Sequence, residues 1–532
     1  MDSSDTTATF HELLVERDVR VPLRDGTYLV ADVFRPDCEG QFPVIITLGP
    51  YSKDIHFRDW SADFDYATLP ERGPYMHWET VNPEWWVPQG YIVIRVDGRG
   101  TGKSPGRVRR LSDDEARDFY DAIEWAGTQP WSNGRCAVMG ISYFAMNAWR
   151  VAATRPPHLA AIVPWEGAVD TYRDAGRHGG IYSNNFNQGW ARNVRRHESG
   201  EDAEPPAQPP APPELFSEEA YNLPDVSRIE VPLLSAGNWG GLGLHLRGNV
   251  EGYLGASSEH KFLEIHSGNH VIPFYSLEGR LFQKRFLDRW LLDVDTGITR
   301  EPPVKLAIRR GGDDYRLRYE NEWPIARTEW TPFYLDARKG SLSLQEPGGD
   351  ATATCSCEPA APSEQARVRF SAVPFEAETE ITGPLKLALW ISSTTDDADL
   401  FAIVRKFDPS GNEVRFPGQS SPAIPAACGW LRASHRKLDP ALSLPYRPYH
   451  THDELQKLVP GEIVPVEVEI WPTSVVFEPG SRLVLDIATR DDPGMEPFLH
   501  THRRDRVNEG ELTIHTGPRY PAHLLLPVIP AR

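Results

Sequence analysis

The sequence is short of cysteine and of long apolar runs, and each shortage excludes a class of protein. Five cysteines in 532 residues, an odd number that is widely spread, do not form a disulfide framework. Cys355 and Cys357 have no second pair or nearby histidine to complete a metal site. No stretch approaches the ~18 apolar residues of a membrane span, and residues 1–7 lack the basic and apolar segments of a signal peptide. We therefore expect a cytoplasmic protein with reduced thiols.

Positive charge is also in short supply. The chain has 56 Lys and Arg residues against 75 Asp and Glu residues, which gives a formal net charge of −19 at pH 7. An acidic surface repels nucleic acids and anionic membranes, so neither is an expected partner. A small molecule remains the expected partner, and self-association into a homo-oligomer is left open. The length of the chain indicates two or three domains.

The first third of the chain alternates apolar runs with helical patterns. Residues 113–127 have helical spacing, and residues 146–153 also read as a helix. The expected strands are 17–22, 28–34, 42–48, 91–96, 135–139 and 159–163. Strands that alternate with helices predict an α/β parallel sheet.

The pattern changes twice after this first third. Between residues 170 and 221 it fails, and 201–214 is nearly all acid, proline and alanine, which predicts an exposed loop. The sheet resumes at 231–236 and 261–265, so the interruption is interpreted as a cap. Short alternating strands then predict an all-β sandwich, at 304–308, 368–370, 385–391, 400–406, 464–470 and 483–489. The predicted domains are 1–166 and 230–300 for the two parts of the α/β core, 167–229 for the cap and 301–532 for the β domain.

Ser142 is placed as a serine nucleophile would be. It follows an apolar strand with Gly140 two residues before it, and the next residues read as a helix. A sharp strand-to-helix turn lifts such a hydroxyl out of the backbone, and the helix N-terminus favours developing negative charge. Gly-x-Ser also recurs by chance, and Phe144 stands where the last glycine of Gly-x-Ser-x-Gly belongs.

Acyl transfer by a serine needs a base, an acid that orients the base, and donors for the oxyanion. His270 directly follows the last predicted strand of the sheet, so it is the expected base. The oxyanion donors are the Tyr143 N–H and, as a second candidate, the phenol of Tyr51, although a tyrosine at this rim more often packs or lines a pocket. We expect no cofactor and no metal, since metal-ligand spacing is missing at His178, His245, His260 and His266.

Four separated motifs occur in order along nearly the whole chain. They are Gly140-x-Ser142-Tyr143, Pro50-Tyr51-x-Lys53, the Gly-rich run from Asp97 to Gly106, and the run from Trp430 to Arg436. Together they resemble the CocE/NonD serine hydrolases, the family of cocaine esterase, X-prolyl dipeptidyl aminopeptidase and the α-amino-acid ester hydrolases. The resemblance implies an α/β-hydrolase core with an inserted, largely helical cap and a C-terminal jelly roll. It also implies that Ser142 is the nucleophile, His270 the base, and Tyr51 with the Tyr143 N–H the oxyanion hole.

Two positions depart from the family pattern. Ala145 replaces the glycine that ends Gly-x-Ser-Tyr-x-Gly, a small change that the turn should tolerate. Gly240 stands where the family has the aspartate of the triad, and the next carboxylate, Glu251, lies well along the following helix. Something else must orient His270, because a histidine with an unfixed tautomer loses much of its rate.

Glu166, at the end of the strand 159–163, is the expected replacement for that aspartate. Parallel neighbouring strands end on the same edge of a sheet, so an acid there can reach the same imidazole. Asp170 and Asn238 are lesser candidates, and Asn238 would fix the tautomer without stabilising an imidazolium by charge. An alternative role for Glu166 is a hinge of the cap, paired with an arginine such as Arg173.

The sequence thus predicts a metal-independent serine hydrolase that cleaves an ester or amide through an acyl-enzyme. One alternative is an acyltransferase that uses the same acyl-enzyme. Another, suggested by the missing aspartate, is a decayed hydrolase fold that only binds a ligand. The lack of a clear acidic cluster for a free amine favours a neutral ester over an aminopeptidase substrate.

Overall fold

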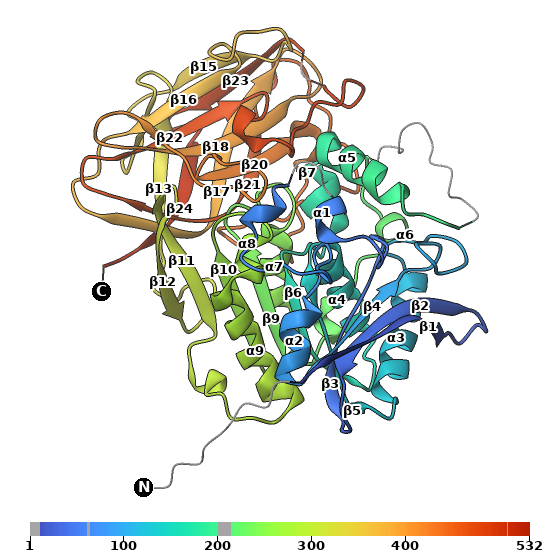
Figure 1. Ribbon diagram of the computed structural model, residues 1–532. Coiled ribbons are helices and arrows are strands. Elements are labelled where there is room, and N and C mark those ends of the chain that lie inside the picture. The colour runs from blue at the N-terminus through green and yellow to red at the C-terminus, as the bar shows by residue number, and fades with distance from the viewer. Residues whose placement is uncertain (1–10, 61–63, 201–213, 508, 532) are drawn as a thin grey trace, which may run out of the picture.

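The computed structural model describes residues 11–60, 64–200, 214–507 and 509–531 (Figure 1). An α/β region, coloured blue to green, lies against a β-rich region, coloured yellow to red. The segment 1–7 and all but the last residue of the expected loop 201–214 lie outside the described residues. Within the described ranges, the helices are too short or too polar to cross a bilayer.

The α/β region is built on a sheet with the strand order β1-β2-β4-β3-β5-β6-β9-β10. β2 is antiparallel to both β1 and β4, and neighbours from β4 onward are parallel. The bounds are β1 (Leu13–Pro22), β2 (Tyr28–Pro36), β3 (Phe42–Gly49), β4 (Ile92–Asp97), β5 (Ser132–Ile141), β6 (Leu159–Trp165), β9 (Leu233–Asn238) and β10 (Lys261–His266). The expected α/β sheet is confirmed, with strand ends shifted by a few residues.

Helices cover both faces of this sheet, because successive side chains of a buried strand point to opposite sides. Val44 and Ile46 of β3 join one apolar cluster with α3 and α4, whereas Ile45 joins another with α9. The N-cap of α3 is Ser112, whose hydroxyl accepts a hydrogen bond from the Glu115 N–H. The helix bounds are α1 (Phe57–Trp60), η1 (Tyr66–Thr68), α2 (Pro83–Trp86), η2 (Val87–Gln89), α3 (Asp113–Gly127), α4 (Tyr143–Ala153), α7 (Leu246–Gly255), α8 (Ile272–Tyr275), α9 (Leu277–Leu291) and η5 (Ile298–Arg300).

The segment between β6 and β9 interrupts the sheet, as the sequence predicts. Its elements are the π-helix η3 (Thr171–Gly176), the hairpin of β7 (Arg177–His178) and β8 (Ile181–Tyr182), α5 (Asn184–Arg195), α6 (Glu218–Tyr221) and η4 (Val226–Arg228). Helix α5 lies between the two regions in Figure 1, and its residues Phe186 and Trp190 reach the cavities beside Ser142.

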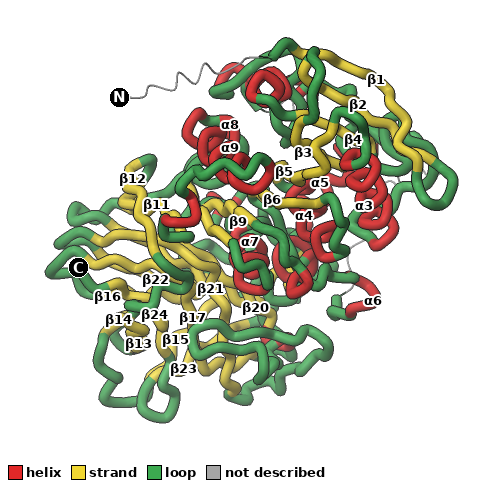
Figure 2. Tube along the Cα trace, turned by 90° about the horizontal axis from the view of Figure 1, so that it is seen from below, coloured by secondary structure: helices red, strands yellow, loops and turns green. Residues whose placement is uncertain are grey.

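The C-terminal region is β-rich, in agreement with the sequence. Its first strand, β11, pairs in parallel with β10, so hydrogen bonding continues from one region into the other. The bounds are β11 (Val304–Gly311), β12 (Asp314–Glu320), β13 (Glu329–Asp336), β14 (Ser341–Ser343), β15 (Ala351–Ser356), β16 (Arg367–Ala372), β17 (Thr379–Ser393), β18 (Asp399–Phe407), β19 (Glu413–Val414), β20 (Ala427–Arg432), η6 (Ala433–His435), β21 (Val464–Phe477), β22 (Arg482–Ala488), η7 (Pro493–Met495), β23 (Glu511–Thr516) and β24 (His523–Ile529). Figure 2 shows the helices gathered beside this mass of strands and loops.

One apolar cluster spans both regions. Leu246 and Val250 of α7 belong to the same buried cluster as Val468 and Ile470 of β21. Burial of aliphatic side chains between the regions resists their separation. Loops of the β-rich region are thereby held close to the ends of the central strands.

Candidate active site

Ser142 sits at a strained turn between β5 and α4. Its backbone has φ 56° and ψ −112°, a conformation that a non-glycine residue adopts at a cost. The Ser142 N–H donates to the carbonyls of Trp165 and Glu166, each at 3.0 Å. A Cβ at Gly140 would lie 2.6 Å from Phe144 and 3.1 Å from the Glu79 carbonyl oxygen, so a side chain there would disturb the turn. The turn has the geometry of a nucleophile elbow.

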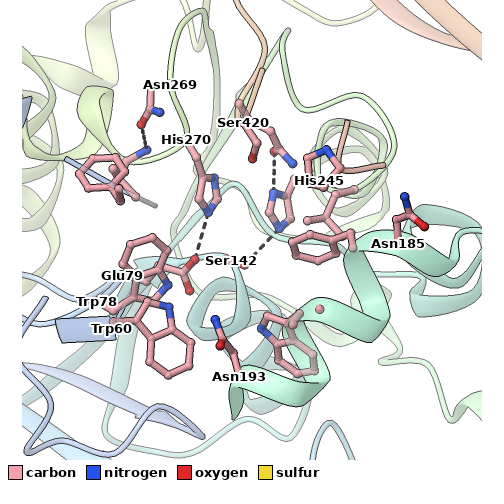
Figure 3. A pocket seen from close by; sticks show the side chains of 18 residues that line it. Trp60, Trp78, Glu79, Ser142, Asn185, Asn193, His245, Asn269, His270 and Ser420 are labelled. Atoms are coloured by element: carbon pink, nitrogen blue, oxygen red, sulfur yellow. Dashed lines mark hydrogen bonds and ion pairs between the residues drawn. The ribbon is translucent and has the colours of Figure 1, made fainter. Parts of the chain in front are cut away.

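The hydroxyl of Ser142 contacts His245, which the sequence analysis considered only as a metal ligand. Ser142 Oγ lies 3.2 Å from His245 Nε2. His245 Nδ1 lies 3.0 Å from the side-chain oxygen of Gln419, in the loop between β19 and β20 of the β-rich region. The dashed lines of Figure 3 trace the contact from Ser142 to His245 and a second contact from His270 to Glu79.

His270 lies in the loop after β10, between two carboxylates. Its Nδ1 is 2.7 Å from Glu166 Oε2, and its Nε2 is 3.0 Å from Glu79 Oε1. When both carboxyl groups are ionised they can only accept, so both ring nitrogens then carry hydrogen and the ring is an imidazolium. The rings of His245 and His270 are stacked with centroids 5.0 Å apart and an interplanar angle of 8°. The described site therefore brings His270 and Glu166 together, with His245 between His270 and Gln419.

Glu166 is fully buried just beyond β6 and accepts hydrogen bonds from several side chains. Its Oε1 faces His266 Nε2 at 2.8 Å and the Asn238 amide at 3.2 Å. Asp170 lies elsewhere, because it caps η3 and pairs with Arg173 at 2.7 Å. Of the three residues considered for orienting His270, Glu166 contacts it, Asn238 donates to Glu166, and Asp170 pairs with Arg173.

The position of Gly240 has no space for an aspartate. A Cβ built there would lie 2.7 Å from the Pro417 carbonyl oxygen, 2.8 Å from Gly418 Cα and 3.0 Å from the Gln419 nitrogen. The Gln419 N–H also donates to the Gly240 carbonyl at 3.0 Å. The loop that delivers Gln419 to His245 thus occupies the place where the side chain of residue 240 would lie.

The two stacked histidines have opposite pKa shifts. Burial alone would lower the pKa of His270, but the negative charge of Glu166, helped by Glu79, outweighs it and raises the pKa to about 10. Burial and the neighbouring His270 charge lower the pKa of His245 to about 3. Burial would raise the pKa of Glu166, but His270 and His266 lower it to about 2. At neutral pH the site holds an anionic Glu166, a cationic His270 and a neutral His245.

Replacing Glu79 with glutamine should lower the pKa of His270 below its wild-type value of about 10, because an amide does not attract the imidazolium. The folded pKa exceeds the ~6.5 of an unfolded histidine. The pairing of His270 therefore stabilises the fold fully below that value, and this stabilisation is lost as the pH rises through about 10. An NMR titration of the ring measures the shift, and urea unfolding at neutral and alkaline pH measures the linked stability.

Glu71→Gln is the matched control, because the half-buried Glu71 carboxylate pairs with Arg280 instead of a histidine. It should leave the His270 titration unchanged. A Glu79→Gln protein whose His270 still titrates at the wild-type value would contradict the pairing.

The Tyr51 loop is held beside Ser142 by the Gly-rich motif of the next strand. Asp97, the last residue of β4, accepts from the Lys53 N–H at 2.6 Å and from the Lys103 N–H at 3.0 Å. Tyr51 is 1% exposed and its hydroxyl accepts from the Trp190 indole at 3.2 Å. Burial and the charge of Glu79 raise its pKa, and the Ser142 hydroxyl also acts on it. The phenol therefore stays protonated and can donate a hydrogen bond at the serine.

Tyr143 opens α4, so its N–H is among those at the helix start that have no acceptor within the helix. Its ring stacks on Trp190 with centroids 5.8 Å apart. Its hydroxyl donates to Glu115 at 2.8 Å, which leaves the main-chain N–H as the group that Tyr143 offers to a ligand at Ser142.

Two cavities meet at Ser142, with volumes of about 430 and 370 Å³. The larger has an aromatic wall of Trp60, Phe64 and Trp78 beside Glu79 and His270. The smaller is lined mainly by apolar and aromatic side chains, among them Leu111, Met146, Tyr182 and Tyr221. Cavities of this size hold small molecules, and a ligand that spans both would cross the serine hydroxyl.

The ligand atoms of Glu166, His245 and His270 lie within 4.8 Å of one another, a spacing that could hold a metal ion. Both Glu166 oxygens, however, already face imidazole nitrogens, at 2.8 and 2.7 Å. The second such group, Asp18, Asp32 and Asp54, surrounds the Lys53 ammonium at 2.6 to 2.9 Å. Both groups are thus engaged in protein hydrogen bonds and ion pairs.

Comparisons with known proteins give matches along nearly the whole chain. Residues 25–220 match a family model described as X-Pro dipeptidyl-peptidase (S15 family), and residues 296–525 match its C-terminal non-catalytic domain. A cocaine esterase from Rhodococcus sp. (strain MB1 Bresler) is 25% identical in an alignment 621 positions long, gaps included. The alignment covers 97% of this chain and 98% of that protein. The crystal structure of a CocE/NonD family hydrolase from Staphylococcus aureus is 33% identical with a TM-score of 0.89, and the match covers 97% of this chain and 94% of that chain. An α-amino acid ester hydrolase, 17% identical with a TM-score of 0.71 over 99% of each chain, has the same fold.

Proposed function

Because this chain belongs to the CocE/NonD family of hydrolases, we propose that it cleaves esters through a covalent acyl-enzyme formed on Ser142. The chain is an enzyme, as the sequence predicts. In this proposal Ser142 is the nucleophile, and His270 with Glu166 is the histidine–carboxylate pair that handles protons. The Tyr51 phenol and the Tyr143 N–H form the oxyanion hole.

The observation that carries the proposal is the position of Ser142. Its hydroxyl lies at a strained turn ahead of a helix N-terminus and contacts an imidazole at 3.2 Å. A second imidazole beside it is bound by the buried carboxylate of Glu166 at 2.7 Å. Nucleophile, imidazole and carboxylate are the groups that acyl transfer by serine requires.

The finer features of the fold are part of the same proposal. The insertion 167–229 acts as a largely helical cap, and 301–532 as a jelly roll that carries the Gln419 loop to the site. The cores 1–166 and 230–300 supply the serine, the acid and His270. We propose a cytoplasmic enzyme that needs no metal, cofactor, nucleic acid or membrane.

The substrate class follows from the two cavities. Aromatic and apolar walls on both sides of Ser142 favour an ester with a hydrophobic group on each side of the carbonyl. The carboxylate nearest the larger cavity, Glu79, is bound to His270 at 3.0 Å. It is therefore engaged within the protein, and we favour a neutral ester over a substrate with a free amine.

A fluorophosphonate probe tests the proposal, because it reacts with activated serines. Wild-type protein should be labelled, and mass spectrometry of the labelled peptide should locate the adduct on Ser142. A panel of neutral aryl and alkyl esters, X-Pro amides and added alcohols should show ester hydrolysis as the fastest reaction. Folded protein that takes no label would support the ligand-binding alternative, and faster acyl transfer to an alcohol than to water would support the acyltransferase.

Replacing Tyr51 with phenylalanine tests the oxyanion hole. The change removes one hydroxyl and keeps the ring, so we expect kcat to fall roughly 10²–10³-fold, as for other single oxyanion donors. KM should change little, because the phenol acts on the charged intermediate. Tyr182→Phe is the control from the neighbouring cavity wall. Equal turnover in Tyr51→Phe and wild type would remove Tyr51 from the proposed hole.

A further inference from the structure

The environment of His245 determines which of its nitrogens carries hydrogen. Nδ1 faces the side-chain oxygen of Gln419 at 3.0 Å, and an amide oxygen can only accept. Nδ1 therefore carries hydrogen. The ring is 1% exposed and lies against a cation, so it stays neutral and its Nε2 has a free lone pair. At 3.2 Å, that nitrogen is placed to accept the hydrogen of Ser142 Oγ.

His270 has the opposite environment. Each of its ring nitrogens faces a carboxylate, at 2.7 Å for Glu166 and 3.0 Å for Glu79. An imidazolium in this position has a proton to give and no lone pair with which to take one. Its Nε2–H faces Glu79, which lines the same cavity as Ser142, so this proton can be offered to a group that occupies the cavity.

We propose that the acid and base duties of a single triad histidine are divided here between two: His245 takes the proton of Ser142, and His270 protonates the leaving oxygen. The proposal rests on the serine hydrolase function above. Titratable groups whose environments push their protonation in opposite directions are typical of acid and base pairs. The neighbours that act on the two rings are Glu166, Glu79, Gln419 and His266, which contacts Glu166 at 2.8 Å.

The acylation step balances as follows. Ser142 Oγ bonds to the carbonyl carbon while its proton moves to His245 Nε2. The bond from carbon to the leaving oxygen then breaks, and that oxygen takes the Nε2 proton of His270. The stacked pair carries one positive charge in the resting enzyme, on His270, and one in the acyl-enzyme, on His245. In the tetrahedral intermediate between these states both rings are charged, and the oxyanion carries the compensating negative charge.

Deacylation runs the same path in reverse. Water attacks the acyl carbon and gives a proton to His270, now neutral and held by Glu166. The Oγ–carbon bond breaks, and Ser142 recovers its proton from His245. The acid product leaves, and both histidines return to their starting states. Each histidine thus acts once as acid and once as base in a turnover.

The role of Gln419 follows from its neutral side chain. Its oxygen fixes the tautomer of His245 but does not stabilise the imidazolium as a carboxylate would, so His245 returns its proton readily. The loop that carries Gln419 fills the space at Gly240. The same loop therefore leaves no space for the aspartate expected at residue 240 and brings Gln419 to His245. Gln419 is a positioning residue, because it acts through His245.

Two esters with one acyl group separate the two duties in pre-steady-state acylation. A p-nitrophenyl ester has a leaving group that needs no acid, whereas the matching ethyl ester needs one. His245→Asn should slow acylation by both esters, roughly 10²–10⁴-fold. His270→Asn should slow acylation by the ethyl ester far more than by the p-nitrophenyl ester. With wild type, acylation by the ethyl ester alone should decline as the pH rises through about 10, the pKa of His270.

Variants of Gln419 leave both histidines in place. Gln419→Leu should slow acylation by both esters, and Gln419→Glu, which restores an acceptor, should rescue it. If His245→Asn acylates at the wild-type rate while His270→Asn loses both esters equally, His270 alone serves as the base and the division is wrong. That result would leave the serine hydrolase proposal intact, since the latter fails only if wild-type Ser142 takes no fluorophosphonate.

Discussion

Ser142→Ala is expected to reduce ester turnover by about 10⁶-fold, the loss seen when a serine nucleophile is removed from a triad enzyme. The hydroxyl of this residue contacts His245, and alanine removes it while keeping the Cβ. The residual rate would come from the oxyanion hole and binding alone. Turnover of a p-nitrophenyl ester, measured with protein purified free of host esterases, checks the value.

Ser420→Ala is the matched control for this substitution. Ser420 lines the same cavity but lies in the β19–β20 loop, away from the turn. We expect it to keep turnover within the wild-type order of magnitude. A Ser142→Ala protein that still hydrolyses the ester and still reacts with fluorophosphonate would place the nucleophile elsewhere.

Much of the α/β region could be predicted from the sequence, because local patterns decide it. Helix α3 begins and ends where its spacing predicts, at Asp113 and Gly127, since an N-cap serine and an apolar stripe agree with each other. The turn at Ser142 was likewise visible as a glycine and a serine between a strand and a helix.

The β-rich region was harder to predict, because several of its strands are only half-buried. In β12, Tyr315, Leu317 and Tyr319 alternate with charged residues, but they are 44%, 43% and 41% exposed, so this alternation marks no face that is buried in the core. Its pairing with β11 is a local hairpin, whereas β11 also pairs with β21 through Arg309 and Val475, a contact between distant residues that single-sequence patterns do not reveal.

Half of the residues of the candidate site could not be predicted from the sequence. The sequence led to His270 and Glu166 because both follow strands that end on one edge of the sheet. Gln419 meets His245 across 174 residues, and Glu79 meets His270 across 191. Gln419 lies in the β19–β20 loop of the β-rich region and Glu79 in the long segment between β3 and β4, and no local pattern fixes where either segment runs. The Gly240 substitution was the one available signal, because it showed that the usual aspartate had been replaced.

Backbone hydrogen bonds between the Ser142 turn and Glu166 explain why the serine stays in place although residue 240 is a glycine. The Ser142 N–H donates to the carbonyls of Trp165, the last residue of β6, and of Glu166 itself, so the backbones of nucleophile and acid are hydrogen-bonded to each other. The sheet therefore fixes the position of Glu166 relative to Ser142. A carboxylate that follows β6 can replace the aspartate expected after β9 without displacing the serine.

Glu166→Gln is expected to lower kcat by about 10⁴-fold, as when the acid of a serine triad becomes an amide. The negative charge of Glu166 counteracts burial and keeps His270 protonated, with a pKa of about 10. An amide removes that charge, and its NH₂ group, turned to Nδ1, would drive the remaining hydrogen of His270 onto Nε2. A neutral ring with hydrogen on Nε2 cannot accept a proton from water, so deacylation stops.

The course of the reaction distinguishes this cause from misfolding. With a p-nitrophenyl ester, Glu166→Gln should give a burst of nitrophenol followed by an almost flat line, because acylation proceeds through His245 and the acyl-enzyme persists. Mass spectrometry should detect the acyl group on Ser142. Asp170→Asn, which removes the acid that pairs with Arg173, is the control and should keep steady turnover. Steady turnover in Glu166→Gln at the wild-type rate would show that the carboxylate behind His270 is dispensable, and the acid would then have to be sought among the other neighbours of that ring, with Glu79 the first to replace.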